Sequence, residues 1–161
     1  MRRVVGSSIL AIVLAFSAAT ISADSPVPTG FAAGIELCPE FICGFALFAG
    51  QFEGQVNSKP ANGGFVAAIT HDDLPEFLQV AEITGGQFII TAGRRTFRGD
   101  VLSGGEIVTL NPERTQFCVA MTLDITDGGS GQVYIRGLLD HGPFPPTIAG
   151  FVTQSPSSCL D

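Results

Sequence analysis

A five-residue unit with a central glycine occurs four times in the chain and constrains its fold more than any other feature. In each copy, two large apolar residues flank a glycine with one spacer on either side. The copies cover residues 52–56, 97–101, 135–139 and 148–152. Because residues i, i+2 and i+4 of a strand share one face, each copy places glycine between two large apolar side chains. Glycine weakens a strand unless it permits a bend or a close backbone approach, so the units predict a sheet that curls into a small barrel.

Alternating apolar and polar residues predict strands along most of the chain. The strongest pair, 116–125 and 132–139, flanks the glycine-rich run 128–131 and predicts a tight hairpin. Further strands are predicted at residues 52–56, 65–70, 82–84, 87–89, 95–102 and 106–110. We expect turns at 57–64 and chain reversals at the glycine pairs 85–86 and 104–105.

These patterns predict an all-β fold, a small soluble antiparallel up-and-down β-barrel of about eight strands. A two-sheet β-sandwich is the alternative, because alternation does not distinguish closure of a sheet from stacking of two sheets. Polar residues at outward positions, such as Gln51 and Glu53, argue against a barrel in an outer membrane. Asp73 and Glu76 resemble a helix capping box, so at most one short helical turn is expected, directly after Asp73.

Residues 1–23 have the pattern of a secretory signal peptide. Arg2 and Arg3 precede the apolar run 9–19, and small residues end at Ala23. The apolar run is too short for a membrane span, so none is expected after cleavage. We therefore expect a secreted protein, either extracellular or periplasmic.

After that cleavage, an irregular lead-in is expected over 24–41 and a single β domain over 42–161. Without Arg2 and Arg3, six basic residues face fifteen acidic ones, a net charge of −9. Such a chain repels phosphate backbones, so nucleic acid is excluded as a partner.

The four cysteines, Cys38, Cys43, Cys118 and Cys159, predict two disulfides in an exported chain. Sequence alone allows three pairings, of which we favour Cys38–Cys43 with Cys118–Cys159. The spacing matches no zinc-binding pattern, and no metal site is assigned.

Both histidines lie beside acidic residues at predicted strand ends, in His71-Asp72 and Asp140-His141. Two histidines and a carboxylate can bind a divalent metal or form a general base held by an acid. The alternative is that all four are solvated turn residues. If the protein has a chemical site, we expect His141 to belong to it.

Arg94 and Arg95, with Arg98, carry half of the positive charge left after cleavage. They can bind a carboxylate or phosphate of a ligand, or pair with nearby acidic residues.

No catalytic signature is present, and no cofactor or catalytic residue is assigned. The sequence favours a secreted, non-catalytic binding or structural module, whose partner is an unknown small molecule or protein. One alternative is a small enzyme or metal-binding protein with a site at one barrel mouth that uses His141 and, with it, His71. A second is a secreted inhibitor that presents the proline-rich loop 142–146.

Overall fold

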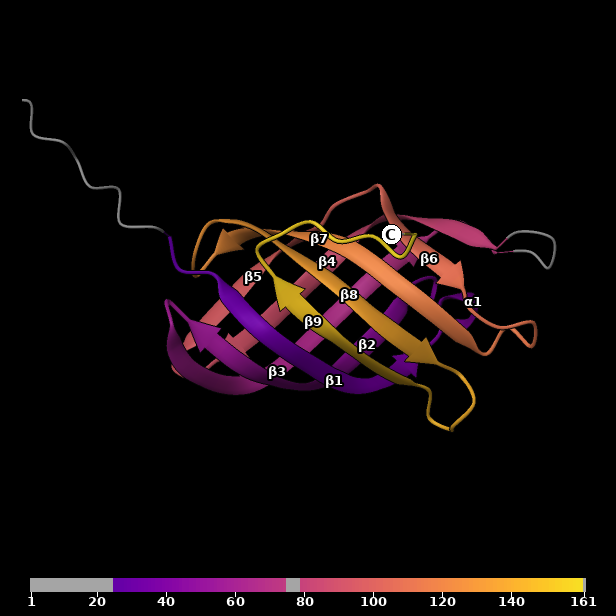
Figure 1. Ribbon diagram of the computed structural model, residues 1–161, viewed down its shortest axis with the longest axis horizontal. Helices are drawn as coiled ribbons and strands as arrows, with labels where there is room; N and C mark the ends of the chain where they lie inside the picture. The colour runs from indigo at the N-terminus through magenta and orange to yellow at the C-terminus, as the bar shows by residue number, and fades with distance from the viewer. Residues whose placement is uncertain (1–24, 75–78, 161) are drawn as a thin grey trace, which may run out of the picture.

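The computed structural model describes residues 25–74 and 79–160, which form a single β-barrel (Figure 1). The proposed signal peptide, and residues 75–78 of the helical turn predicted after Asp73, lie outside the described residues. The described elements are β1 (Pro28–Cys38), α1 (Glu40–Cys43), β2 (Ala46–Val56), β3 (Lys59–His71), β4 (Val80–Ala92), β5 (Arg95–Val101), β6 (Gly105–Thr109), β7 (Gln116–Asp127), β8 (Gly131–Asp140) and β9 (Thr147–Thr153). No helix among them is long and apolar enough to cross a membrane.

The sheet closes on itself, because β9 pairs with β1 as well as with β8. Every pairing is antiparallel, and consecutive strands are neighbours around the barrel except where β5 and β6 share one position. The closed antiparallel barrel of eight strands confirms the predicted fold class over the sandwich alternative.

The predicted hairpin between β5 and β6 is wrong. The second half of β4 pairs with β5 and its first half pairs with β6, so β5 and β6 run in the same direction. The backbone N–H groups of Leu102 and Gly104, in the break between them, donate to carbonyl oxygens of the neighbouring strands β7 and β4. The glycine pair 104–105 therefore interrupts one strand position of the barrel and does not reverse the chain.

The predicted reversal at Gly85 and Gly86 is also wrong, because both glycines lie inside β4. A bulge occurs here, since Thr70 pairs with Gly85 whereas the next residue, His71, pairs with Ile83. A Cβ atom on Gly86 would lie 2.1 Å from the carbonyl oxygen of Ala68. Glycine at this position allows β3 and β4 to approach closely where the sheet bends.

The prediction of an irregular lead-in over 24–41 is wrong. Most of this stretch forms β1, and α1 begins at its end. The barrel therefore starts at Pro28, upstream of the expected domain start at residue 42. A Cβ atom on Gly34 would lie 2.2 Å from the carbonyl oxygen of Ala49 on β2. Glycine at position 34 is therefore required by the close contact between β1 and β2.

The turn expected over 57–64 is shorter than predicted. Only Asn57 and Ser58 reverse the chain, with φ angles of 51° and 60°, as in a two-residue hairpin turn. Residues 59–64 already belong to β3.

The five-residue glycine units face the barrel interior as predicted. Their apolar positions, including Phe52, Phe97 and Val152, are buried or pack against the core. Val133, just before the third unit, is also buried. Gly137 and Gly150 pair directly across β8 and β9. A Cβ atom on Gly137 would lie 2.9 Å from the Cα atom of Gly150, so the two glycines allow these strands to approach.

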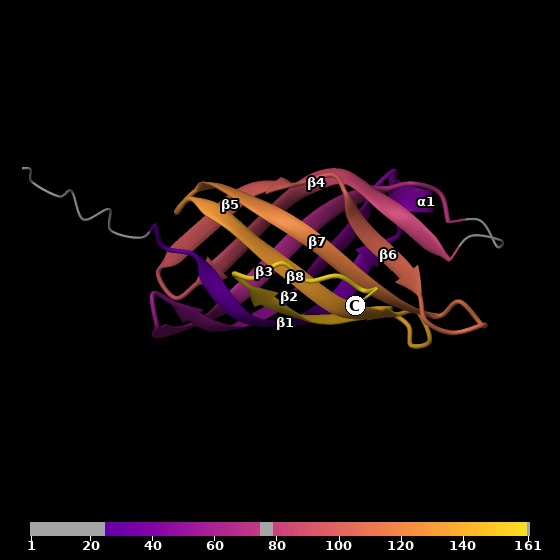
Figure 2. The ribbon, with the colours of Figure 1, turned by 45° about the horizontal axis from the view of Figure 1, so that its top comes forward.

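The two ends of the barrel differ, and we call them the mouth and the far end. The mouth is the end where β1, β3, β6 and β8 finish and where α1 lies, at the right in Figures 1 and 2. At the far end, Val27 packs against the core, and the backbone at Pro26 passes over Gly129. The segment before β1 thus helps to close the far end, whereas the mouth keeps a cavity.

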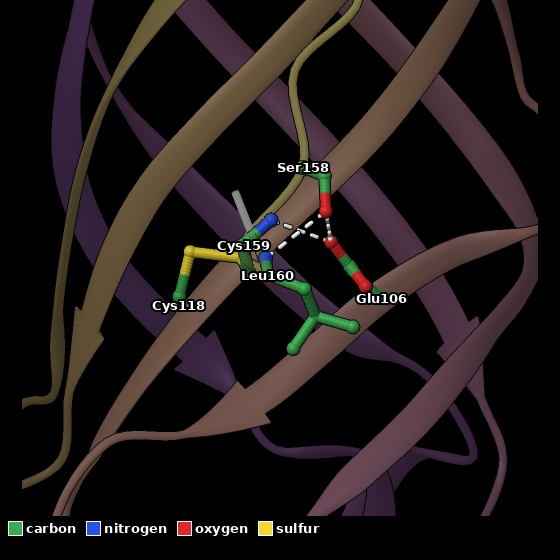
Figure 3. The surroundings of a disulfide bond; sticks show 5 residues. All are labelled: Glu106, Cys118, Ser158, Cys159 and Leu160. Carbon is green, nitrogen blue, oxygen red and sulfur yellow. Dashed lines mark hydrogen bonds between the residues drawn. A yellow bond between two sulfur atoms is a disulfide. The ribbon is translucent and has the colours of Figure 1, made fainter.

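Both predicted disulfides are present, Cys38–Cys43 and Cys118–Cys159. The second disulfide holds the C-terminal segment, which runs back over the outside of the barrel after β9 (Figures 1 and 2). One carboxylate oxygen of Glu106 accepts hydrogen bonds from the Ser158 hydroxyl and the Cys159 backbone N–H (Figure 3). This covering explains why the outward residue Cys118 is buried.

Candidate functional site

A pocket of about 530 Å³ opens at the mouth of the barrel. Its floor is apolar and includes Phe48, Ile69 and Val119, and its upper part carries two histidines, three acidic residues and Arg114. Below the floor, the same three apolar residues also border a void of about 40 Å³. This void is far smaller than the pocket at the mouth.

His71, at the end of β3, is held by Glu40 of α1. Its Nε2 atom lies 2.7 Å from Oε2 of Glu40, and its backbone N–H donates to Oε1 of the same carboxylate at 3.3 Å. The other ring nitrogen, Nδ1, lies 2.7 Å from the carbonyl oxygen of Asp72. Both ring nitrogens therefore have partners within the protein.

These contacts restrict what His71 can do. A carbonyl oxygen only accepts hydrogen bonds, so Nδ1 carries the hydrogen in its contact with Asp72. With both nitrogens engaged, His71 fastens α1 to the end of β3.

His141 follows β8 and is held differently. Its backbone N–H donates to the carbonyl oxygen of Thr115 at 2.7 Å, and its ring packs at a tilt against Phe117, with centroids 5.3 Å apart. The Nε2 atom lies 3.1 Å from Oε2 of Glu36. The ring is thus positioned at the pocket by its backbone and one aromatic neighbour.

Glu36 is the buried charged residue of the pocket, with 6% of its surface exposed. It occupies an inward position of β1, two residues beyond Gly34 and paired across the sheet with Phe48. Its Oε2 atom is buried and accepts no hydrogen bond, because the contact with His141 lacks hydrogen-bond geometry. A buried carboxylate oxygen without a hydrogen bond is costly in a folded protein.

Arg114 belongs to the loop between β6 and β7 and lines the same pocket. Its Nη2 atom donates to the carbonyl oxygen of Leu74 at 2.7 Å. The side chain of Asn111 orders this loop by bonding to Thr115 and to the backbone of Gln116. The guanidinium therefore links two loops across the mouth.

The two predicted aspartates do not join the pocket. Asp72 is exposed, and its carbonyl oxygen, not its carboxylate, contacts His71. Asp140 accepts hydrogen bonds from the backbone of Gly142 and from the side chain of Gln116, so it stabilises the turn after β8. The carboxylate beside the His141 ring is that of Glu36, not that of its sequence neighbour Asp140.

The arginine cluster lies away from the histidines. Arg94 and Arg95 are exposed at the reversal between β4 and β5, which is at the far end. Arg98 pairs with Asp127 at 3.0 Å, and both side chains are exposed. The predicted candidates thus separate, with His71 and His141 at the mouth and Arg94 and Arg95 at the opposite end.

Sequence reasoning missed Glu36, Glu40 and Arg114. The first two lie in the stretch expected to be irregular, where side-chain direction could not be assigned. A signal was available for Glu36, because Ala32, Gly34 and Glu36 share the inward face once residues 28–38 are read as a strand. Arg114 lies in a loop, and nothing in its local sequence marks it.

The described residues contain no group of three or more histidines, cysteines or acidic residues arranged to hold a metal ion. Both histidines line one pocket, but each faces its own glutamate. What the pocket offers is an apolar floor and a polar upper part in which His141 and Glu36 can donate, accept or exchange protons.

No protein-family model matches the chain, and neither the curated proteins nor the solved structures contain a significant match to it.

Proposed function

We propose that this protein binds one small, largely apolar molecule in the mouth of its barrel. The observation that supports this most is the pocket of about 530 Å³, with its apolar floor and its few convergent polar groups. Small-molecule sites commonly have volumes of about 300–1,000 Å³ and this combination of lining residues. An eight-stranded barrel is just wide enough for one such ligand.

The proposed role is binding without chemistry on the ligand. His71 is engaged at both ring nitrogens, so the two-histidine site suggested by the sequence would have to break existing contacts. The residues of the mouth are also tied to one another, through α1, the loop of Arg114 and the turn after β8. Such ties favour a preformed pocket, which lowers the cost of binding.

We also propose that the protein is exported and that it matures by cleavage after Ala23. Two disulfides are consistent with an oxidising environment outside the cytoplasm. The intact mass of the protein recovered from the medium or periplasm should correspond to residues 24–161. Recovery of the full chain in a membrane fraction would contradict export as a processed protein.

The binding proposal can be tested with N-phenyl-1-naphthylamine, an uncharged probe that fluoresces in apolar surroundings. We expect this probe to bind. Ile107→Trp narrows the pocket and should weaken binding about tenfold or more, because the probe then loses several apolar contacts. The matched control is Ile89→Trp, on the outer surface. Absence of binding to the unmodified protein, or equal effects of the two variants, would overturn the proposal.

A second candidate function is inhibition or docking of another protein through the loop 142–146. Phe144 is 98% exposed at the centre of this loop, as the inhibitor alternative requires. Flanking prolines reduce the entropy that the loop loses on binding. Because chymotrypsin-like proteases take large apolar side chains in a specificity pocket, chymotrypsin is the first target to assay. Inhibition that disappears in Phe144→Ser would support this function, and no inhibition would contradict it for that class of protease.

A further inference from the structure

Among the described residues that line the pocket, one buried side-chain polar atom makes no hydrogen bond, the Oε2 atom of Glu36. The main chain at this residue is fixed, because the Glu36 backbone N–H donates to the carbonyl oxygen of Pro146 at 2.9 Å. This charged side chain occupies an inward position of a barrel strand, where an apolar residue is expected. A carboxylate at such a position is expensive unless something donates a hydrogen bond to it.

The cationic groups around the pocket are already engaged. His71 contacts Glu40 and the carbonyl oxygen of Asp72, and Arg114 donates to the carbonyl oxygen of Leu74. Nε2 of His141 lies 3.1 Å from Oε2 of Glu36 but donates no hydrogen bond to it. The buried atom left for a ligand to satisfy is therefore an acceptor, and an anionic ligand would meet a buried carboxylate there.

We infer that the ligand is an apolar molecule with a hydroxyl or amine group, and that this group donates a hydrogen bond to Oε2 of Glu36. This inference rests on the proposed function and specifies the ligand class of the same pocket. Glu36 pairs across the sheet with Phe48, which forms part of the floor. A ligand whose polar group lies at Glu36 can thus place its apolar part against Phe48, Ile69 and Val119.

The test measures displacement of N-phenyl-1-naphthylamine by four probes with similar chains: 1-decanol, decylamine, 1-methoxynonane and decanoate. 1-Decanol and 1-methoxynonane have the same number of heavy atoms, but only the alcohol can donate a hydrogen bond. We expect 1-decanol and decylamine to displace the dye at concentrations about tenfold lower than 1-methoxynonane, because a hydrogen bond to a buried charged group is among the stronger ones. Decanoate should be the weakest competitor.

Variants of Glu36 test whether the preference for 1-decanol over 1-methoxynonane depends on its Oε2 atom. Glu36→Leu should reduce the ratio between 1-methoxynonane and 1-decanol to about one, whereas Glu53→Gln, at an exposed glutamate of β2 that does not line the pocket, should leave it unchanged. Glu36→Gln keeps the side-chain shape and one acceptor oxygen, so it replaces Glu36→Leu as the test variant if the latter does not fold. We expect its ratio between 1-methoxynonane and 1-decanol to be intermediate.

The outcomes separate the two proposals. If the dye and all four probes fail to bind, the binding function itself is wrong. If they bind but the alcohol and the ether compete equally, or decanoate competes best, the pocket binds apolar molecules and the inferred ligand class is wrong.

Discussion

The two ends of this barrel are built from the same strands but are closed to different degrees. At the far end, Phe52 and Phe97 are fully buried, and Val27, in the segment before β1, packs against the core. At the mouth, Phe117 and Leu139 are nearly as buried, yet they border a pocket of about 530 Å³. The far end is thus tightly packed, whereas the mouth retains a pocket.

The difference between the ends also appears in how charge is arranged. The Arg98–Asp127 pair near the far end is exposed to solvent on both sides. At the mouth, Glu36 and Glu40 point toward histidines that line the pocket. Charges at the far end are solvated as on any surface, whereas those at the mouth are held where a bound molecule would meet them. We therefore expect substitutions at the far end to affect stability most, and those at the mouth to affect binding most.

The largest expected effect separates the two ends by packing. Phe52→Ala should lower the free energy of unfolding by about 3–5 kcal/mol, because it leaves a cavity in a closed layer. Phe117→Ala should cost less, about 3 kcal/mol or below, since the ring already borders open space. Denaturant unfolding of both variants measures the difference. Equal losses would show that the mouth is packed as tightly as the far end.

The next effect concerns the paired glycines that let β8 and β9 approach. Gly137→Val should lower the free energy of unfolding by roughly 1–3 kcal/mol or more, because its Cβ would lie 2.6 Å from the carbonyl oxygen of Ala149. Arg136→Val, at the exposed neighbouring position, should change it by about 0.5 kcal/mol or less. Thermal or denaturant melts that coincide for the two variants would contradict the role of glycine here.

A smaller effect compares the two kinds of ion pair. Glu40→Ala removes both contacts to His71 and should cost roughly 1–2 kcal/mol, because the pair is half-buried and ties α1 to β3. Asp127→Ala removes the exposed pair with Arg98 and should cost about 0.5 kcal/mol or less. Chemical denaturation of the two variants is the measurement. If Asp127→Ala is the more damaging change, the charges at the mouth do not have the structural role proposed for His71.

Much of the fold was predictable because alternation and glycine spacing are local properties. The β7–β8 hairpin, the inward glycine units and both disulfides agree with the sequence-based predictions. The errors arose where glycine had two interpretations. Gly85 and Gly86 suggested a turn, but they allow a bulge inside β4, a distinction that depends on the neighbouring strand.

The candidate site was predictable only in part for the same reason. His71 and His141 lie near acidic residues in the sequence, but the carboxylates that face their rings come from β1 and α1. Those partners are brought together by closure of the barrel, which pairs β1 with both β2 and β9. Neighbours along the chain, Asp72 and Asp140, instead serve the local backbone or solvent. A residue's partner across a closed sheet depends on register, and register was not available from the sequence.

The smallest expected change in stability is at the loop 142–146. Phe144 is almost fully exposed and packs against nothing in the core, so Phe144→Ser should change the free energy of unfolding by about 0.5 kcal/mol or less. The same variant should bind N-phenyl-1-naphthylamine as the unmodified protein does, because Phe144 does not line the pocket. Equilibrium unfolding and dye titration of this one variant check both expectations. A clear loss of stability would mean that the ring packs against the barrel in solution. A loss of dye binding alone would mean that the loop covers the pocket. The loop 142–146 would then be part of the binding site.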